Sequence, residues 1–323
     1  MTNSDEDAKI AYQTLTRDLS RKLDVLWDME TQDPDDYLTL CMLATHPCTN
    51  LRAVTVTPGT LDQVGLVRKT LQKLGRESIP IGARNQKATQ DSISAFHYKV
   101  EKWETSEPDG SAADIIYQTI QQFPELTIIT GGPVGNLALA LQQYPDLVIH
   151  RWVAQGGFAG DNIVPEEHRM HKFRGKQECP TWNFGGDSKS AKYLLSSSRI
   201  LERICVSKNV CHGVVYNLDF HRVVQASVRD NNAPLGLKQV YKAMSIYLQK
   251  KGQKALHDPL AACVAIDPSI CTLALVELYE ADVKRNGWGS RASAAPNTLI
   301  SVSVNKQRFK ELFCMITQPD PDF

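Results

Sequence analysis

Short apolar runs alternate along the chain with longer stretches in which apolar residues recur at helical spacing. The runs that favour strands lie at residues 24–27, 51–57, 79–81, 126–130 and 147–153. Residues 37–43 exemplify the helix-compatible spacing between them. This rhythm is typical of a mostly parallel central sheet with helices on both faces, so the sequence predicts a doubly wound α/β fold.

The chain shows no internal repeat, low-complexity linker or composition break that would mark a second domain. Its 323 residues, 42% of them hydrophobic, are enough for one large α/β domain. We therefore expect an N-terminal leader over residues 1–21, a single domain over 22–315 and a C-terminal tail over 316–323.

Several predicted strands run directly into glycine or proline. These turns lie at residues 58–59, 82, 131–133 and 156–157. In open α/β sheets, ligands bind in a crevice beyond the carboxyl ends of the strands. The glycine and proline turns are therefore expected to surround a binding crevice.

Charge and targeting signals narrow the classes of partner. With 36 basic and 36 acidic residues the formal net charge is zero, which gives no electrostatic reason to expect nucleic acid or a membrane surface. No segment is long enough to span a membrane, and the acidic start lacks the features of a signal peptide. Eight cysteines without disulfide or zinc spacing suggest free thiols, so we expect a cytoplasmic protein with a small-molecule substrate.

Two acidic motifs are the main candidates for chemistry. Five carboxylates fall within residues 28–36, between a predicted strand and a predicted helix, and His257-Asp258 lies far downstream. Asp35 and Asp36 would occupy the first turn of the helix, so helix capping is one explanation. Five neighbouring carboxylates repel one another unless a cation or hydrogen-bond donors hold them, and oxygen ligands favour Ca²⁺ or Mg²⁺ over zinc.

Three motifs in register resemble one known family. They are residues 28–36, the sequence Thr130-Gly-Gly-Pro-Val-Gly-Asn-Leu-Ala138, and residues 257–268. Over residues 22 to 315 the chain resembles the inosine-uridine-preferring nucleoside hydrolases. The resemblance implies hydrolysis of the N-glycosidic bond of a ribonucleoside or related N-riboside, with a Ca²⁺ ion and an aspartate cluster activating the water. It also implies a nucleoside-like substrate and a homodimer or homotetramer.

The resemblance assigns the general base and the metal to the acidic residues. Asp28 or Glu30 matches the base that takes a proton from water. Which of Glu30 and Asp33 joins the metal stays open. The expected metal ligands are Asp28, Asp33, Asp36, Asp258 and a backbone carbonyl of Val134 or Gly135.

The resemblance also places residues around the substrate. Asp35 is expected to hold a ribose hydroxyl, and His257 to protonate or hydrogen-bond the leaving base. Asn162 and Asn183 match residues that contact the sugar, Asn162 near its 5′ end. Trp182 is the candidate for stacking on the base.

The sequence departs from the family pattern at three places. The first loop reads Asp28-Met-Glu30 followed by Thr-Gln-Asp-Pro, where the family has Asp-x-Asp followed by Pro-Gly. Thr181-Trp-Asn183 replaces Glu-Phe-Asn, so a carboxylate beside the sugar is missing. Residues 166–178 are longer and more basic than expected. They form either a solvated surface loop or a lid that meets an acidic or phosphorylated group through one or more of His168, Arg169, His171, Lys172 and Arg174.

Two other functions stay open. Asp28-Met-Glu-Thr31 imitates the loop of haloacid-dehalogenase-type phosphatases, in which the first Asp is the nucleophile and Mg²⁺ binds nearby. That class does not explain His257-Asp258. The second alternative is a non-catalytic nucleoside-binding or other ligand-binding protein that kept the fold and lost some contacts.

Overall fold

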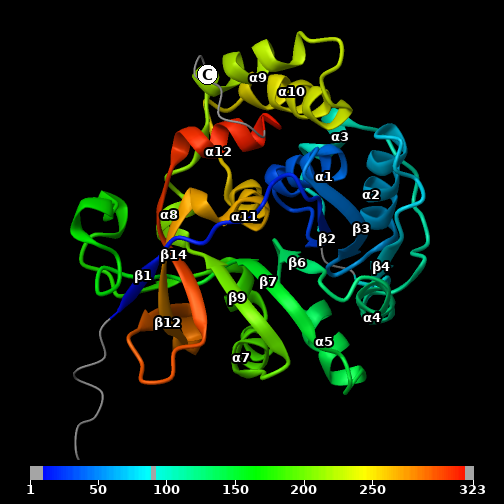
Figure 1. Cartoon of the computed structure of the whole chain (residues 1–323). Coiled ribbons are helices and arrows are strands. Elements are labelled where there is room, and N and C mark those ends of the chain that lie inside the picture. The colour runs from blue at the N-terminus through cyan, green and yellow to red at the C-terminus, as the bar shows by residue number, and fades with distance from the viewer. Residues whose placement is uncertain (1–9, 89–91, 317–323) are drawn as a thin grey trace, which may run out of the picture.

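A computed structural model describes residues 10–88 and 92–316 (Figure 1). The strands predicted from apolar runs are all present, and a twelve-stranded sheet runs through the molecule in the order β5-β4-β3-β2-β6-β7-β9-β14-β12-β13-β8, with β1 paired to β12. The parallel strands are β2 (Leu23–Met29), β3 (Thr49–Val56), β4 (Ile81–Ala83), β5 (Gly110–Ser111), β6 (Thr127–Thr130), β7 (Ile149–Gln155), β9 (Ile200–Val206) and β14 (Thr298–Val304).

The sheet continues into an antiparallel edge. This part consists of β1 (Ala11–Gln13), β8 (Glu178–Pro180), β12 (Cys271–Asp282) and β13 (Gly287–Arg291). Because β1 lies within residues 1–21 and pairs with β12, the expected leader is not separate from the sheet. All but residue 316 of the expected tail lies outside the described residues. A separate pair, β10 (Val215–Tyr216) and β11 (Lys254–Ala255), lies near the candidate site.

Helices cover both faces of the sheet (Figure 1). The α-helices are α1 (Pro34–Thr45), α2 (Leu61–Lys73), α3 (His97–Val100), α4 (Ala112–Gln122), α5 (Gly135–Gln143), α6 (Trp182–Gly186), α7 (Ser188–Ser196), α8 (Lys208–Cys211), α9 (Leu218–Val228), α10 (Leu235–Leu248), α11 (His257–Ile266) and α12 (Lys306–Phe313). Short 3₁₀ turns are η1 (Glu166–His168), η2 (His171–Phe173), η3 (Pro268–Ile270) and η4 (Val283–Arg285). The doubly wound α/β prediction is confirmed.

Strand β2 shows how the two faces divide. Successive side chains of a strand point to opposite faces. Val25, Trp27 and Met29 pack with α1, α11 and α12 in one core, whereas Leu26 packs with α4, α5 and α7 in the other. Both faces of β2 are buried, so the acidic loop that follows its carboxyl end lies in the middle of the molecule.

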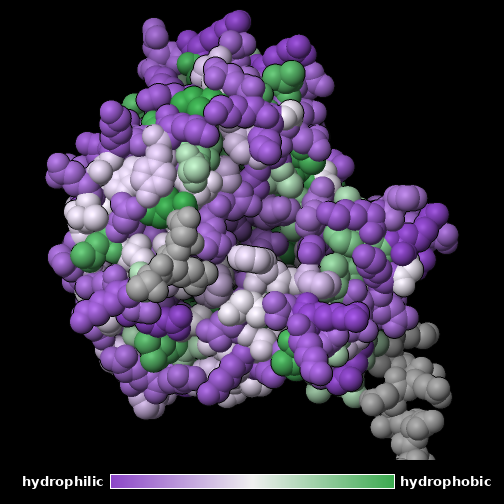
Figure 2. Space-filling view, turned by 180° about the vertical axis from the view of Figure 1, so that it is seen from behind, coloured by the Kyte–Doolittle hydropathy of each residue, from purple (hydrophilic) through white to green (hydrophobic). Residues whose placement is uncertain are grey.

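The helices, the cysteines and the surface bear on the expected setting of the protein. No helix in the two described stretches is long and apolar enough to cross a membrane. All eight cysteines are buried and free. The face in Figure 2 is mostly hydrophilic, with hydrophobic residues scattered over it. The homodimer or homotetramer therefore stays a prediction.

Candidate active site

The acidic loop lies where β2 passes into α1, as predicted. Helix α1 begins at Pro34, Asp33 is its N-cap residue, and Asp35 and Asp36 fall in its first turn. The Asp33 side chain makes no capping hydrogen bond. Asp35 instead bonds to a different helix, so capping of α1 does not account for these carboxylates.

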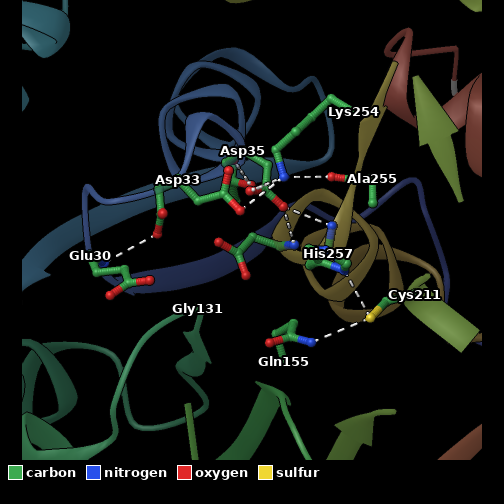
Figure 3. A network of polar contacts seen from close by, with 12 residues as sticks. Glu30, Asp33, Asp35, Gly131, Gln155, Cys211, Lys254, Ala255 and His257 are labelled. Atoms are coloured by element: carbon green, nitrogen blue, oxygen red, sulfur yellow. Dashed lines mark hydrogen bonds and ion pairs between the residues drawn. The ribbon is translucent and has the colours of Figure 1, made fainter. Parts of the chain in front are cut away.

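Asp35 connects the two acidic motifs (Figure 3). Its Oδ2 accepts hydrogen bonds from the backbone N–H groups of His257, at 2.8 Å, and Asp258, at 3.2 Å. Its Oδ1 lies 3.0 Å from Nζ of Lys254. Burial raises the pKa of Asp35, but Lys254 and His257 outweigh that effect, and the net pKa is below its ordinary value. Asp35 is therefore a fixed carboxylate at the first turn of α11.

Lys254 is a site residue that the sequence analysis missed. It is buried, and its Nζ also lies 3.0 Å from Oδ2 of Asp33 and 2.8 Å from the Ala255 carbonyl oxygen. Burial alone would lower the pKa of Lys254, but the two carboxylates outweigh it and raise the pKa. An isolated lysine three positions before His257 gives no recognisable signal, because only the fold brings β11 beside the acidic loop.

Asp258 approaches the end of β6 closely. A Cβ atom on Gly131 would lie 2.8 Å from the carboxylate of Asp258 and 2.2 Å from the ring of Trp27. Real Cβ atoms do not come that close, so glycine is required here. The glycine at the carboxyl end of β6 thus makes room for the Asp258 carboxylate.

Three buried carboxylates form a group suited to a cation. Ligand atoms of Asp35, Asp36 and Asp258 lie within 4.8 Å of one another. Oδ1 of Asp36 accepts from the Glu30 N–H at 3.2 Å, whereas its buried Oδ2 has no hydrogen-bond partner within the described part of the chain. Burial, and then repulsion between the carboxylates, raises the pKa of Asp36 and of Asp258 well above the ordinary value. Such an oxygen-only cluster fits a hard cation, which would offset this repulsion.

A cavity of about 310 Å³ opens on this cluster. Its lining residues are Glu30, Gln32, Asp33, Asp35, Asp36, Gly131, Gln155, Trp182, Asn183, His257 and Asp258. Eight of these residues were predicted as site residues, although they come from three separate stretches of the chain. A larger depression of about 610 Å³ on α2 contains one carboxylate, Glu104, and no acidic group comparable to this one. We therefore place the candidate site in the smaller cavity.

Asp28 does not line this cavity. Its Oδ1 accepts from Oγ1 of Thr55 at 2.7 Å and from Nδ2 of Asn136 at 2.8 Å, which ties β2 to β3 and α5. Burial raises the pKa of Asp28 to about 6, although Thr55 and Asn136 lower it. Asp28 and Glu30 were alternatives for the general base, and the structure brings only Glu30 to the cavity.

Three further predicted residues also lie away from the cavity lining. Nδ2 of Asn162 donates to the Ser290 carbonyl at 2.7 Å. The Val134 carbonyl accepts the first backbone hydrogen bond of α5, from Ala138 at 3.2 Å. A Cβ atom on Gly135 would meet Arg84 and Asp187 rather than the acidic cluster. The Val134 carbonyl and the Asn162 amide thus have partners in the helix and in a strand, and the assignment of Val134, Gly135 and Asn162 to metal and sugar stays a prediction.

Asn183 and Gln155 form a polar wall of the cavity. Nδ2 of Asn183 donates to Oε1 of Gln155 at 2.7 Å and to the Gly131 carbonyl at 3.0 Å. Gln155 was not among the residues predicted for the site. Its place at the carboxyl end of β7 was the available signal, because such strand ends surround the crevice.

His257 has a defined partner at one ring nitrogen. Its Nδ1 lies 3.1 Å from Sγ of Cys211, which also accepts from Nε2 of Gln155 at 3.4 Å (Figure 3). Burial raises the pKa of Cys211 to about 12, so its S–H can donate to Nδ1 of His257. Burial lowers the pKa of His257, although Asp35 raises it. A neutral ring with Nδ1 as acceptor leaves its N–H at Nε2.

Trp182 lies at the mouth of the cavity. Its side chain is 67% exposed, whereas Trp27, Trp152 and Trp288 are fully buried. It hydrogen-bonds Glu30, whose pKa is raised by burial, and further by Asp33 and Asp35, to about 7. A carboxyl group with a pKa near neutrality, next to an exposed aromatic ring in a cavity, is typical of an active site.

The sequence profile described as "Inosine-uridine preferring nucleoside hydrolase" matches residues 25–311. An uncharacterized protein of Schizosaccharomyces pombe is 24% identical over 174 residues, which span 51% of this chain and 48% of that protein. The chain thus matches about half the length of this curated relative.

Solved structures show the same fold. A plant nucleoside hydrolase is similar with a TM-score of 0.69 and 20% identity, covering 92% of this chain and 99% of that one. The inosine-uridine preferring nucleoside hydrolase of Bacillus anthracis has a TM-score of 0.69 and 17% identity, covering 92% and 100%. The purine-preferring ribonucleoside hydrolase of Gardnerella vaginalis has a TM-score of 0.66 and 19% identity, covering 91% and 97%.

Proposed function

Because the chain belongs to the inosine-uridine preferring nucleoside hydrolase family, we propose that it hydrolyses the N-glycosidic bond of a ribonucleoside or related N-riboside. The oxygen of water bonds to the anomeric carbon, the bond to the base breaks, and the base leaves with a proton. The observation that carries this proposal is the buried group of Asp35, Asp36 and Asp258, which opens on a cavity that also holds His257.

The cation of this site is proposed to be Ca²⁺, held chiefly by Asp36 and Asp258. Both oxygens of Asp35 already have partners, whereas Oδ2 of Asp36 has none among the residues described. Ca²⁺ accepts irregular sets of oxygen ligands, including hydroxyls and water. When bound, the ion supplies positive charge that favours deprotonation of water at neutral pH.

Glu30 is proposed as the general base. It lines the cavity, and its pKa of about 7, set mainly by burial, suits a group that accepts a proton near neutral pH. Asp35 would accept a hydrogen bond from a ribose hydroxyl, because Lys254 and the first turn of α11 hold it ionised and in place. The transition state carries positive charge on the sugar, which the surrounding carboxylates stabilise.

The leaving base is proposed to lie between His257 and Trp182. Nδ1 of His257 faces Cys211, so its N–H at Nε2 is the group left to hydrogen-bond the departing base. Trp182 offers an exposed ring for stacking. Asn183, fixed by Gln155, would contact the sugar.

The position of Asp28 does not suit the phosphatase alternative. A phosphatase of the haloacid-dehalogenase type needs Asp28 as an accessible nucleophile, but Asp28 is fully buried and lines neither the acidic cavity nor its neighbours. A non-catalytic nucleoside-binding protein would use the same cavity without turnover, so only an activity measurement separates it from a hydrolase.

The test is release of ribose from purine and pyrimidine nucleosides. The protein is assayed as purified, after chelation, and after Ca²⁺ or Mg²⁺ is restored. We expect chelation to abolish release, Ca²⁺ to restore it, and Asp258→Asn to lower kcat/KM by at least about a hundredfold. Asp219→Asn, an exposed position on α9, is the matched control. Calcium and nucleoside binding without any ribose release would establish the binding protein instead.

A further inference from the structure

A second, smaller cavity adjoins the acidic one and differs from it in charge. It measures about 110 Å³, and it shares Gln155, Trp182 and His257 with the acidic cavity. The remaining lining residues are Gly156, Gly157, Thr181, Lys208 and His212. None of the lining residues is a carboxylate. We call this space the basic annex.

Two lysines bring positive charge to the basic annex: Lys208 lines it, and Lys172 lies beside its lining residue His212. Nζ of Lys208 donates to the Pro180 carbonyl at 2.6 Å, which leaves two of its three N–H donors. Nζ of Lys172 lies 3.1 Å from Nδ1 of His212. Among the ion pairs of residues 10–88 and 92–316, none includes Lys172 or Lys208. The annex can therefore receive an anion.

His212 adds a directed neutral donor. Burial is the largest cause that lowers the pKa of His212, to about 3, and the ammonium groups of Lys172 and Lys208 lower it further. Its Nδ1 faces the Lys172 ammonium and acts as acceptor, so the ring N–H is at Nε2. Thr181 contributes a buried hydroxyl that has no hydrogen-bond partner in the described structure.

The basic segment 166–178 is anchored beside the annex. Phe173 packs edge-on against Phe158 and against His212, with ring centroids 5.3 and 5.4 Å apart. The Gly175 N–H donates to Oδ2 of Asp161 at 2.5 Å. These contacts place Lys172 at His212, whereas Arg169 turns away and donates to the Val164 carbonyl at 3.0 Å.

We propose that the basic annex binds a phosphate group carried by the ribose of the substrate, so that the protein acts on nucleoside monophosphates. This inference rests on the proposed function. The annex has about a third of the volume of the acidic cavity, which suits a substituent rather than a base. A phosphate offers several strong acceptor oxygens to separate donors such as Lys208 and His212.

The lining of the annex agrees with this assignment. Thr181 and the other lining residues bring no carboxylate that would repel a phosphate. In the proposed reaction water attacks the anomeric carbon and only the glycosidic bond breaks. The products are the base and a ribose phosphate, and the phosphate ester stays intact.

The test compares each nucleoside with its 5′-monophosphate. We expect kcat/KM to be at least about tenfold higher for inosine and uridine 5′-monophosphates than for inosine and uridine. Lys208→Met should lower this ratio by about tenfold or more, and Lys172→Met severalfold, because each removes a charge-assisted contact. Lys208→Arg should keep most of the ratio. Lys242→Met, an exposed position on α10, is the matched control and should leave the ratio unchanged.

Binding of ribose 5-phosphate and of ribose, measured by calorimetry with Ca²⁺ present, separates the two proposals. If no substrate is hydrolysed but ribose 5-phosphate binds more tightly than ribose and loses that advantage in Lys208→Met, the annex is supported and the hydrolase is not. Nucleosides could instead be hydrolysed with about the same kcat/KM as their 5′-monophosphates, and no lysine variant could change this ratio. In that case the hydrolase proposal stands and the proposed phosphate site in the annex is overturned. A preference for pyridine ribosides that carry a carboxylate on the ring, with no preference for a phosphate on the ribose, would also overturn the proposal. The bound anion would then belong to the base.

Discussion

Asp35 and His257 are joined by a hydrogen bond of 2.8 Å between Oδ2 of the carboxylate and the backbone nitrogen. These residues are 222 positions apart in the sequence. The same oxygen accepts from Asp258, and the other oxygen faces Lys254. One carboxylate thus sets the position of α11 relative to the acidic loop, and with it the spacing between Asp36 and Asp258.

Replacing Asp35 by alanine is expected to destabilise the protein. Two backbone N–H groups and a buried ammonium lose their acceptor, which outweighs the relief of repulsion from Asp36 and Asp258. We expect the free energy of unfolding to fall by about 2 kcal/mol or more. Urea unfolding with a chelator present measures this without a contribution from bound cation. Asp219→Ala serves as the control, and a loss no larger than in that variant would contradict the structural role of Asp35.

Asp36→Asn should have the opposite effect on the protein without cation. Burial and repulsion from Asp258 and Glu30 raise the pKa of Asp36, so a neutral side chain there relieves strain in the cluster. We expect about 1 kcal/mol of added stability in chelator.

The same variant should lose the response to Ca²⁺. Wild-type protein at a Ca²⁺ concentration a hundred times Kd is expected to gain about 2.7 kcal/mol, whereas Asp36→Asn gains little. Thermal unfolding with and without Ca²⁺ gives both quantities. Equal Ca²⁺ stabilisation of the two proteins would show that Asp36 is not a ligand.

The fold and several candidate site residues could be predicted because they are encoded in short, contiguous stretches of the sequence. The alternation of apolar strands and helices is a local pattern, and the confirmed elements follow it. Carboxylates in the first turn of α1 and at the start of α11 are equally local, so Asp36 and Asp258 could be named in advance.

Other site residues could not be predicted because their roles depend on long-range packing. Lys254 reaches Asp33 across 221 positions, and Cys211 meets His257 across 46. Asp28 carries the right chemistry in the right motif, but Thr55 and Asn136 hydrogen-bond one of its carboxylate oxygens, and the residue does not line the cavity. Motif matching identified which acids gather near the site, and only the packing decided which of them faces the cavity.

His46, which lies outside the candidate site, should make the free energy of unfolding depend on pH. Its Nδ1 accepts from the Cys48 N–H at 3.0 Å and its Nε2 lies 3.1 Å from the Leu312 carbonyl. Burial lowers its pKa from 6.5 to about 4, so the unfolded chain binds a proton first as the pH falls. The stabilisation is complete above pH 6.5 and is lost as the pH falls from 6.5 towards 4.

Between pH 7.5 and 5.5 this effect should cost about 1.3 kcal/mol. It is measured as the difference between wild type and His46→Asn in urea unfolding at the two pH values, since both proteins share the other histidines. The asparagine keeps an acceptor for Cys48. If the two proteins lose the same free energy over this range, His46 is not the group responsible.

Trp182 offers an optical signal for the substrate. It is 67% exposed, so it should contribute the most solvent-exposed part of the tryptophan fluorescence, which a nucleoside stacked on its ring would quench. Trp182→Phe should remove that part of the emission and keep most of the affinity. Trp182→Ala should raise KM about three- to tenfold with a smaller change in kcat, because stacking on the base acts in the ground state as well as in the transition state. Leu201→Ala, another exposed hydrophobic position, is the control. A large fall in kcat at unchanged KM would instead tie Trp182 to the chemical step, through its hydrogen bond to Glu30.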